Sequence, residues 1–312
     1  DADGNRVTPA NAQIQLTSVD AEVFNTATIT TSTGVADFDT AVNKVGLRGT
    51  VGSKTIKFSL VADPTINISQ TGLQLTAGDV AKLGVTVQPQ DTTAGVAFGT
   101  AVKVGVQDAW GNAVSSSTTI TPTLVDGISR GALTGSGITS ADANTDSQGV
   151  ATFTGMSFSR AGAVRIKFEN SAGLATYSEP FTISVAAPHH ITWDVQPDVA
   201  IENRATISTA PVASIRDEFE NLVSTGYSAS ATLGTSSGNL AVVANATRVA
   251  SGGKFTFNSL VVGGRTGSYA FRISDITVTK TADSSSVVLN SYSTSSSNFT
   301  VTHGVANKLT LI

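Results

Sequence analysis

Cysteine is absent from this 312-residue sequence, methionine occurs once, and only 13% of the residues are charged. The absence of cysteine excludes disulfides, catalytic thiols and zinc sites built on thiolates. The net charge of −4 comes without a basic patch, so composition argues against a nucleic-acid partner. No apolar run reaches the roughly 18 residues of a membrane-spanning helix. The sequence therefore predicts neither a nucleic-acid partner nor a membrane-spanning segment.

Hydrophobic residues make up 40% of the chain, which is enough for a packed core. Many of them alternate with polar residues, as Val102, Val104 and Val106 do around Lys103 and Gly105. Alternation with a period of two is typical of β-strands with one buried and one solvated face. Strands are predicted in this way within 11–18, 98–107, 117–124, 180–185 and 190–195.

Internal repeats organise the chain. The pattern D-x-x-x-N occurs at 1–5, 108–112 and 217–221, at spacings of 107 and 109 residues. The stretch KLGVTVQP (82–89) matches HITWDVQP (190–197), and KLTLI recurs at 308–312. Two further sets of matching segments keep the same order: 31–38, 146–153 and 251–257, then 55–60, 165–170 and 270–275. Four markers in one order establish a repeat of about 110 residues.

Short strands in units of this length predict an all-β fold of tandem immunoglobulin-like β-sandwich domains in an extended array. The predicted units are 1–80, which lacks its first strands, 81–187, 188–303, and 304–312 as the first strand of a following unit. We expect this chain to be a window from a longer array. The alternative is that the ANKLTLI segment of a neighbouring molecule adds to an open sheet edge, although it cannot replace both missing strands.

The segments VKVGVQDAWGNAVSSSTTITPTL and TDSQGVATFTGMSFSRAGAVRIKF resemble bacterial Ig-like domains of the intimin and invasin type. The resemblance covers 81–187 well and the flanking units 1–80 and 188–303 more loosely. Glu220 stands where the pattern has Gly, and Gly253–Lys254–Phe255 departs from its G-x-A element. The resemblance implies a cell-surface or secreted protein whose tandem domains act as stalk, adhesive tip, filament or surface-layer unit.

The D-x-x-x-N segment allows two interpretations. As a turn, Asp108 bonds backbone amides and Gly111 supplies a positive φ. As a calcium loop, Asp108 and Asn112 supply oxygen ligands. The turn is favoured, because the third position holds Trp110 and Phe219 in the later copies. In the first copy the candidate metal ligands are Asp1, Asp3 and Asn5.

A second calcium candidate is DANTDSQG (142–149), where Asp142, Asn144 and Asp146 alternate like the start of a calcium loop. An EF-hand loop needs Gly at its sixth and Glu at its twelfth position, and these are Ser147 and Phe153. A solvated turn is the favoured alternative. Asp79, Asp194 and Asp198 near the domain junctions form a third calcium hypothesis, and no other cofactor is predicted.

Trp110 and Phe219 occupy the same position in successive repeats and are the candidate partner contacts. An aromatic side chain at a loop tip suits a glycan or host protein, or packing against the next domain or a second copy. His189, His190 and His303 lie at junctions. Adjacent residues of a strand point to opposite faces, so a polar linker pair is favoured over a metal site for the first two.

The sequence has no cysteine nucleophile and no HExxH motif, so the chain is not predicted to be an enzyme. The sequence predicts a non-catalytic structural repeat protein, extracellular on the bacterial cell surface: a stalk, filament or surface-layer subunit. The alternative is an adhesin that recognises a glycan or host protein through its loop tips.

Overall fold

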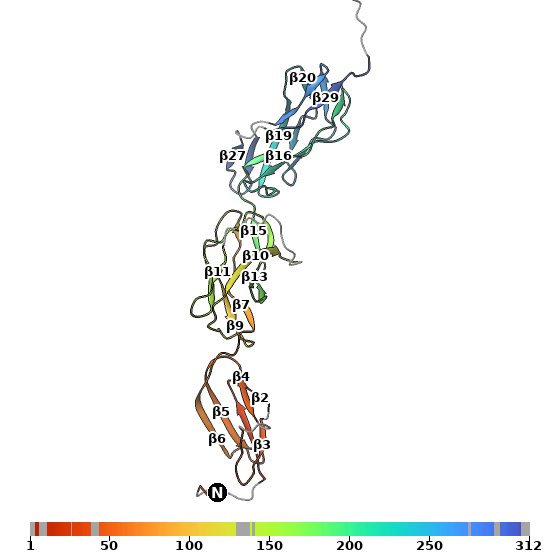
Figure 1. The fold of residues 1–312 in the computed structure, drawn as a ribbon. Helices are drawn as coiled ribbons and strands as arrows, with labels where there is room; N and C mark the ends of the chain where they lie inside the picture. Colours follow the sequence, from red (N-terminus) through yellow and green to blue (C-terminus); the bar gives the residue numbers. More distant parts are fainter. Residues whose placement is uncertain are drawn as a thin grey trace, which may run out of the picture.

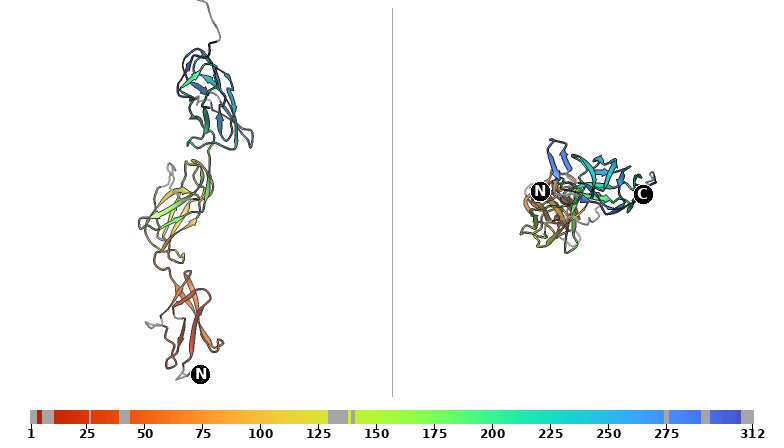
Figure 2. Two further views of the ribbon diagram at one scale, coloured as in Figure 1. Left: turned by 90° about the vertical axis from the view of Figure 1, so that its right-hand side faces the viewer. Right: turned by 90° about the horizontal axis from the view of Figure 1, so that it is seen from above.

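Three β-sheet units follow one another end to end in the computed structural model (Figure 1), and a second side view shows the same arrangement (Figure 2). The structure describes residues 4–5, 11–25, 27–38, 44–128, 138, 141–273, 276–289 and 294–306. All their regular elements are strands, which confirms the predicted all-β fold of Ig-like domains. Asp1, Asp3 and residues 307–312 lie outside the described residues, so the roles predicted for them stay predictions.

The first unit has a four-stranded sheet in the order β3-β1-β5-β6 and a separate two-stranded sheet of β2 and β4. All pairs in them are antiparallel. The strands are β1 (Gln13–Ser18), β2 (Glu22–Asn25), β3 (Thr28–Thr30), β4 (Val45–Arg48), β5 (Gly52–Leu60) and β6 (Asn67–Leu75).

The second unit is a sandwich of two sheets. One follows β11-β10-β13-β15-β8, with β14 added to β13, and the other follows β12-β9-β7. The strands are β7 (Lys82–Val87), β8 (Thr92–Thr93), β9 (Val102–Gln107), β10 (Thr119–Asp126), β11 (Ala143–Asn144), β12 (Val150–Phe153), β13 (Gly162–Asn170), β14 (Ala175–Tyr177) and β15 (Phe181–Ser184).

The third unit has a three-stranded sheet, β16-β18-β22, that corresponds to the three-stranded sheet of the second unit. Its second main sheet follows β27-β26-β19-β25-β28, and β21 pairs with β19. Two small sheets, β17-β29-β24 and β20-β23, complete it. The first strands are β16 (His190–Val195), β17 (Ala200–Glu202), β18 (Val212–Arg216), β19 (Tyr227–Thr235), β20 (Leu240–Ala244), β21 (Thr247–Val249) and β22 (Lys254–Thr256). The others are β23 (Val261–Gly264), β24 (Gly267–Tyr269), β25 (Phe271–Ile273), β26 (Ile276–Lys280), β27 (Ser286–Leu289), β28 (Thr294–Ser295) and β29 (Phe299–Thr302).

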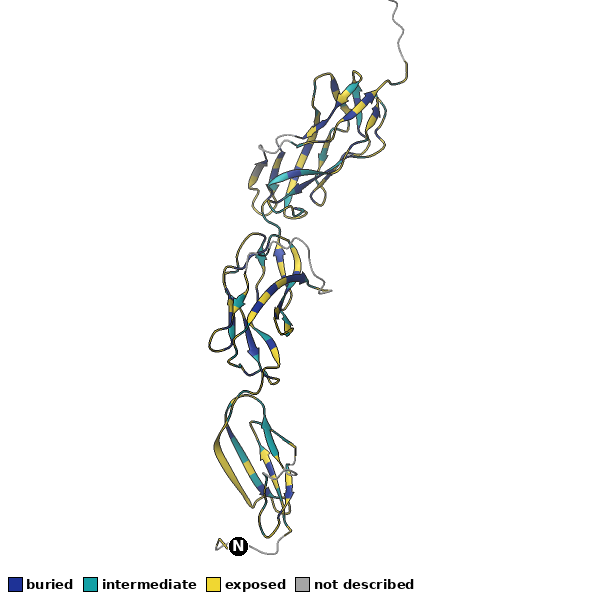
Figure 3. Cartoon of the chain, in the orientation of Figure 1, coloured by how far each residue is buried: buried dark blue, intermediate teal, exposed yellow. Residues whose placement is uncertain are grey.

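Burial differs sharply between the units (Figure 3). The second and third units each hold one cluster of buried aliphatic and aromatic side chains between their sheets. Phe168 and Phe271 are fully buried there, and each such side chain stabilises its domain by about 1.5–3 kcal/mol. In the described part of the first unit, Leu16 and Ile29 are the buried hydrophobic side chains. No helix of the described chain has the length and apolar character to cross a membrane.

Candidate functional site

The turn at Asp108 is built by the Asp side chain. Its Oδ1 accepts hydrogen bonds from the backbone N–H groups of Trp110 and Asn112, each at 2.9 Å. Gly111 has a φ of +89°, a conformation that glycine adopts without steric cost. The predicted roles of Asp108 and Gly111 in a turn therefore match the geometry.

The same two polar side chains also reach the preceding domain. Asp108 Oδ2 accepts from the Asn112 side-chain amide at 2.8 Å and from the Gly78 N–H of the linker at 3.0 Å. Asn112 Oδ1 accepts from the Val51 N–H at 2.9 Å, and its Nδ2 donates to the Gly49 carbonyl at 2.8 Å. Both side chains are buried, at 3% and 7% exposure. The turn thus holds the loop between β4 and β5 of the unit before it.

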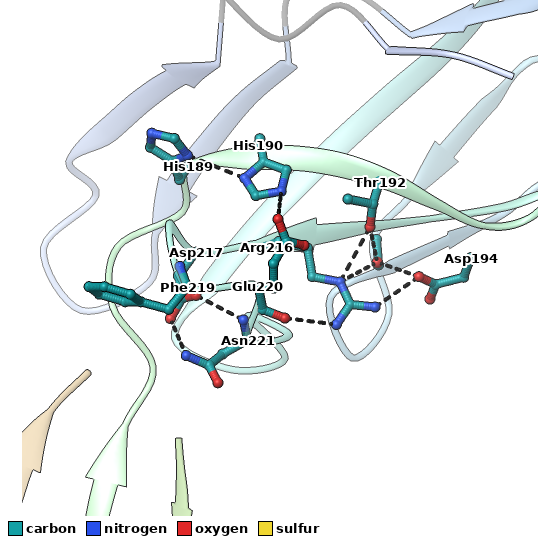
Figure 4. Close-up of polar contacts among 10 residues, drawn as sticks. His189, His190, Thr192, Asp194, Arg216, Asp217, Phe219, Glu220 and Asn221 are labelled. Carbon is teal, nitrogen blue, oxygen red and sulfur yellow. Dashed lines mark hydrogen bonds and ion pairs between the residues drawn. The ribbon is translucent and has the colours of Figure 1, made fainter. Parts of the chain in front are cut away.

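The second junction repeats this arrangement with Asp217 and Asn221 (Figure 4). The six hydrogen bonds correspond one to one, with paired distances that differ by at most 0.1 Å. The bonded backbone groups are those of Phe219, Asn221, Ala186, Ser159 and Ala161. We call each set of six bonds a junction clamp: the first is made by Asp108 and Asn112, the second by Asp217 and Asn221.

The third residue of each turn contacts the preceding domain as well. The Arg48 guanidinium lies 4.9 Å from the centre of the Trp110 ring and 5.2 Å from that of Phe24, within range of a cation–π interaction. The Phe219 ring lies against Gly95, where a Cβ would come 2.4 Å from a ring carbon. Both candidate partner residues therefore touch the neighbouring domain of the same chain. Contact with a second molecule stays a prediction.

Polar contacts surround the second clamp on one side (Figure 4). His190 Nε2 lies 2.9 Å from a Glu220 carboxylate oxygen, and Arg216 donates to the Glu220 backbone carbonyl at 3.1 Å. Glu220 has a φ of 68°, so it adopts the left-handed conformation that Gly111 takes in the first turn. His189 is 3.2 Å from His190 between ring nitrogens. This linker pair is part of a hydrogen-bonded junction.

The calcium candidates are engaged in other contacts. Asp146 Oδ1 accepts from the N–H groups of Gln148 and Val150, both at 2.9 Å, and Asn144 Oδ1 accepts from the Thr119 hydroxyl at 2.7 Å. Asp142 is exposed. In the described residues, no group of three His, Asp or Glu side chains is placed to hold a metal ion. Calcium binding at Asp142, Asn144 and Asp146 stays a prediction, and a melting temperature unchanged by EDTA would remove it.

Asp194, a junction calcium candidate, is paired with cations of the protein. Its carboxylate lies 2.9 Å from Arg216 and 3.2 Å from Lys254. Burial raises the pKa of this carboxyl, but hydrogen bonds from Arg216, Ser214 and Lys254 outweigh burial and lower the pKa below its ordinary value. The carboxylate therefore links the three strands of the β16-β18-β22 sheet through its side-chain contacts.

The pKa of Asp108 is lowered to about 2 from an ordinary value of 3.8. Burial raises the pKa of this carboxyl, but hydrogen bonds from Asn112, Gly78 and Trp110 lower it, and their combined effect is larger than that of burial. A carboxylate whose pKa is lower in the folded than in the unfolded chain stabilises the fold above the unfolded pKa.

The first clamp is therefore expected to loosen only in strong acid. Its contribution is complete above about pH 4 and is lost as the pH falls through about 2. An NMR titration that follows the Gly78 amide proton measures this directly. A midpoint near 2 is the expected result, and a midpoint near 3.8 would show that the carboxylate is not held by these donors.

The sequence favours a turn over a calcium loop for Asp108 and Asn112 and places partner contact at the third position. That interpretation is incomplete, because the Asn side chain bonds across the junction. A signal was present in the repeats. A turn needs the Asp and a residue that tolerates positive φ, yet all three copies also keep Asn at the fifth position, while the third and fourth positions vary.

No protein-family model matches the chain, and no curated protein sequence does. Among solved structures, the Escherichia coli adhesin FdeC is 16% identical, with 98% of this chain and 90% of that chain covered and a TM-score of 0.33. Invasin, a bacterial integrin-binding protein, is 12% identical, with 94% and 53% covered and a TM-score of 0.31. The surface layer protein SbsC (domains 1–6) is 13% identical, with 98% and 37% covered and a TM-score of 0.25. Bacterial adhesins with tandem Ig-like domains are thus among the structural neighbours, and the likeness concerns the fold alone.

Proposed function

We propose that the chain is a non-catalytic structural repeat protein, extracellular on the bacterial cell surface, which acts as a stalk, filament or surface-layer subunit. The observation that carries the proposal is the junction clamp, which occurs at both junctions with the same donors and acceptors. A repeated clamp between successive domains restrains bending, and restraint of bending is what a spacer or filament requires.

Each clamp contributes two hydrogen bonds between the Asn side chain and the preceding domain. At about 1 kcal/mol net for each bond, one clamp favours the aligned junction by about 2 kcal/mol, roughly a 30-fold shift in population. Both side chains of the first clamp are buried, so water competes little for these bonds. The clamps are therefore sufficient to keep three domains in line for most of the time.

Small-angle scattering of the purified chain tests the proposal. We expect a radius of gyration well above the roughly 20 Å of a compact chain of this length, with a pair-distance distribution that has the long tail of a rod. A compact particle, or one whose scattering requires freely jointed domains, would contradict a rigid spacer.

A second candidate function, adhesion, is favoured by one observation. Trp110 is 48% exposed and lines a cavity of about 570 Å³ at the first junction, together with Phe24 and Arg48. Half-exposed aromatic rings stack on sugars and anchor protein partners. Binding of the wild-type chain and of a Trp110→Ala variant to a glycan array tests this candidate.

A further inference from the structure

The segment VQP occurs at 87–89 and at 195–197, where β7 and β16 end. Its proline is buried in both copies, as Pro89 and Pro197, while the glutamine before it, Gln88 or Gln196, is exposed. Proline has a fixed φ, so the buried ring holds the glutamine at a defined place on the surface of its domain. The same three residues therefore stand at the same point of the second and the third domain.

Each glutamine bonds to the backbone just before the last strand of its own domain. Gln88 Oε1 accepts a hydrogen bond from the Glu179 N–H at 2.9 Å, and Gln196 Oε1 accepts one from the Ser297 N–H at 2.7 Å. The bonded residues lie 91 and 101 positions further along the chain. The VQP segment thus joins the beginning of each domain to its end.

The backbone before each last strand is held in the same way in both domains. A buried serine precedes the bonded N–H, and its hydroxyl oxygen accepts from another strand: Ser178 from the Ile166 N–H and Ser296 from the Phe271 N–H, both at 3.0 Å. Two residues after the bonded N–H, a buried phenylalanine opens the last strand: Phe181 in β15 and Phe299 in β29. The glutamine bonds therefore belong to a repeated arrangement that fixes where the last strand begins.

The segment that follows each VQP pairs with the same last strand, and the pairing is parallel. In the second domain β8 pairs with β15 over two residue pairs, and in the third β17 pairs with β29 over three. The Ala94 N–H also donates to the Ser184 carbonyl at 2.9 Å, and the Thr300 N–H donates to the Val199 carbonyl at 2.8 Å. The first and the last segments of each domain are thus joined by main-chain bonds and by the glutamine side chain.

Tension along the row of domains acts on this contact in shear. Figure 1 shows β7 toward the end of the second unit that faces the first unit, and β15 at the end that faces the third. A chain pulled from both sides therefore draws the segment after β7 and the last strand in opposite directions. Because the strands of a parallel pair run the same way, the pull acts along both strands, and their evenly spaced bonds are strained together.

We propose that Gln88 and Gln196 are tension-bearing latches, which keep the last strand of their domain in place when the chain is stretched. The latches rest on the proposed structural function, because only a stalk or filament that is pulled makes use of them. A hydrogen bond at the surface adds little to the stability of a domain at rest, since water replaces it when it opens. Under tension, the glutamine bond has to break together with the strand pair beside it, so it slows unfolding.

Magnetic tweezers that hold the full chain by its two ends at constant force test the latches. Gln88→Ala is expected to shorten the lifetime of the folded second domain about fivefold, the fold-change that corresponds to one lost hydrogen bond. Gln196→Ala is expected to shorten the lifetime of the third domain to a similar degree. Each variant identifies its own domain, because a different unfolding step of the trace should change in each.

The matched control is Asn170→Ala in the second domain. Asn170 Oδ1 accepts hydrogen bonds from the Ala172 and Leu174 N–H groups at 3.1 and 3.0 Å, within the turn between β13 and β14. These bonds join no segments that tension draws apart. The control should unfold faster than the wild type in urea and keep the wild-type lifetime under force. Gln88→Ala should show the reverse, with a melting temperature close to that of the wild type.

Two outcomes would overturn the latches. One is a lifetime under force that is the same in the wild type and in both glutamine variants. The other is a lifetime that Asn170→Ala shortens as much as Gln88→Ala does, which would mean that any loss of stability has this effect. The spacer fails separately: a straight rod in scattering whose glutamine variants resist force like the wild type would support the spacer and refute the latches, and a compact particle would refute the spacer whatever the lifetimes.

Discussion

A chain with Asn112→Ala and Asn221→Ala together is expected to lose its straight arrangement and to bend at both junctions. Each substitution removes the two hydrogen bonds that run from the Asn side chain to the preceding domain. The loss of about 2 kcal/mol at each junction lowers the preference for the aligned state about 30-fold. In small-angle scattering, the longest distances of the particle should shorten and its flexibility should rise.

The matched control for this double variant is Asn203→Ala. Asn203 makes the same pair of side-chain bonds, to the N–H and carbonyl of Gly264, but both partners belong to the third domain. Its loss should lower the melting temperature of that domain and leave the overall shape unchanged. If the double variant scatters like the wild type, contacts such as that of Phe219 with Gly95 hold the junctions without the clamps.

Gly149→Ala is expected to have the largest effect on stability, a loss of about 4 kcal/mol in the second domain. Gly149 has a φ of +75°, and a Cβ at this position would lie 2.0 Å from the Val114 carbonyl oxygen. Left-handed backbone costs a non-glycine residue about 1–2 kcal/mol, and overpacking adds typically 1–3 kcal/mol. Calorimetry of the full chain should show the transition of this domain at a much lower temperature.

Gly155→Ala separates the two causes. Gly155 also has a positive φ, of +67°, but no atom lies within 4 Å of the position of its Cβ. This variant should lose only the backbone term, about 1 kcal/mol. Equal losses in both variants would mean that the close approach of Val114 does not matter.

The repeat accounts for how much of the fold could be predicted. Alternation in 98–107 identified a strand whose valines are buried, and the structure has β9 there with Val102, Val104 and Val106 at 0% exposure. The glycine shared by the repeated segments 146–153 and 251–257 has a physical explanation. Gly253 has a positive φ and faces the Val223 carbonyl, as Gly149 faces that of Val114. Periodicity and turn chemistry are local properties, so they can be inferred from the sequence.

The clamps could not be inferred in the same way. The hydrogen bonds of Asn112 reach residues that are 61 and 63 positions away in the sequence. The local sequence at 49–51 does not show that its backbone groups bond to a side chain of the next domain. Glu220 stands where the repeat pattern has glycine. The structure shows that it keeps the left-handed conformation and that its side chain lies beside His190, a partner set by the fold of the junction.

Hydrogen exchange of the Val51 and Ala161 backbone amides tests the central claim most directly. Each donates its N–H to an Asn side chain of the next domain, at 2.9 Å in both cases. Val51 is 46% exposed, so burial of its side chain cannot account for protection of this amide. Clamped junctions predict slow exchange at both amides in the wild type and fast exchange in the Asn112→Ala and Asn221→Ala chain. Exchange at the rate of a free amide in the wild type would contradict the account.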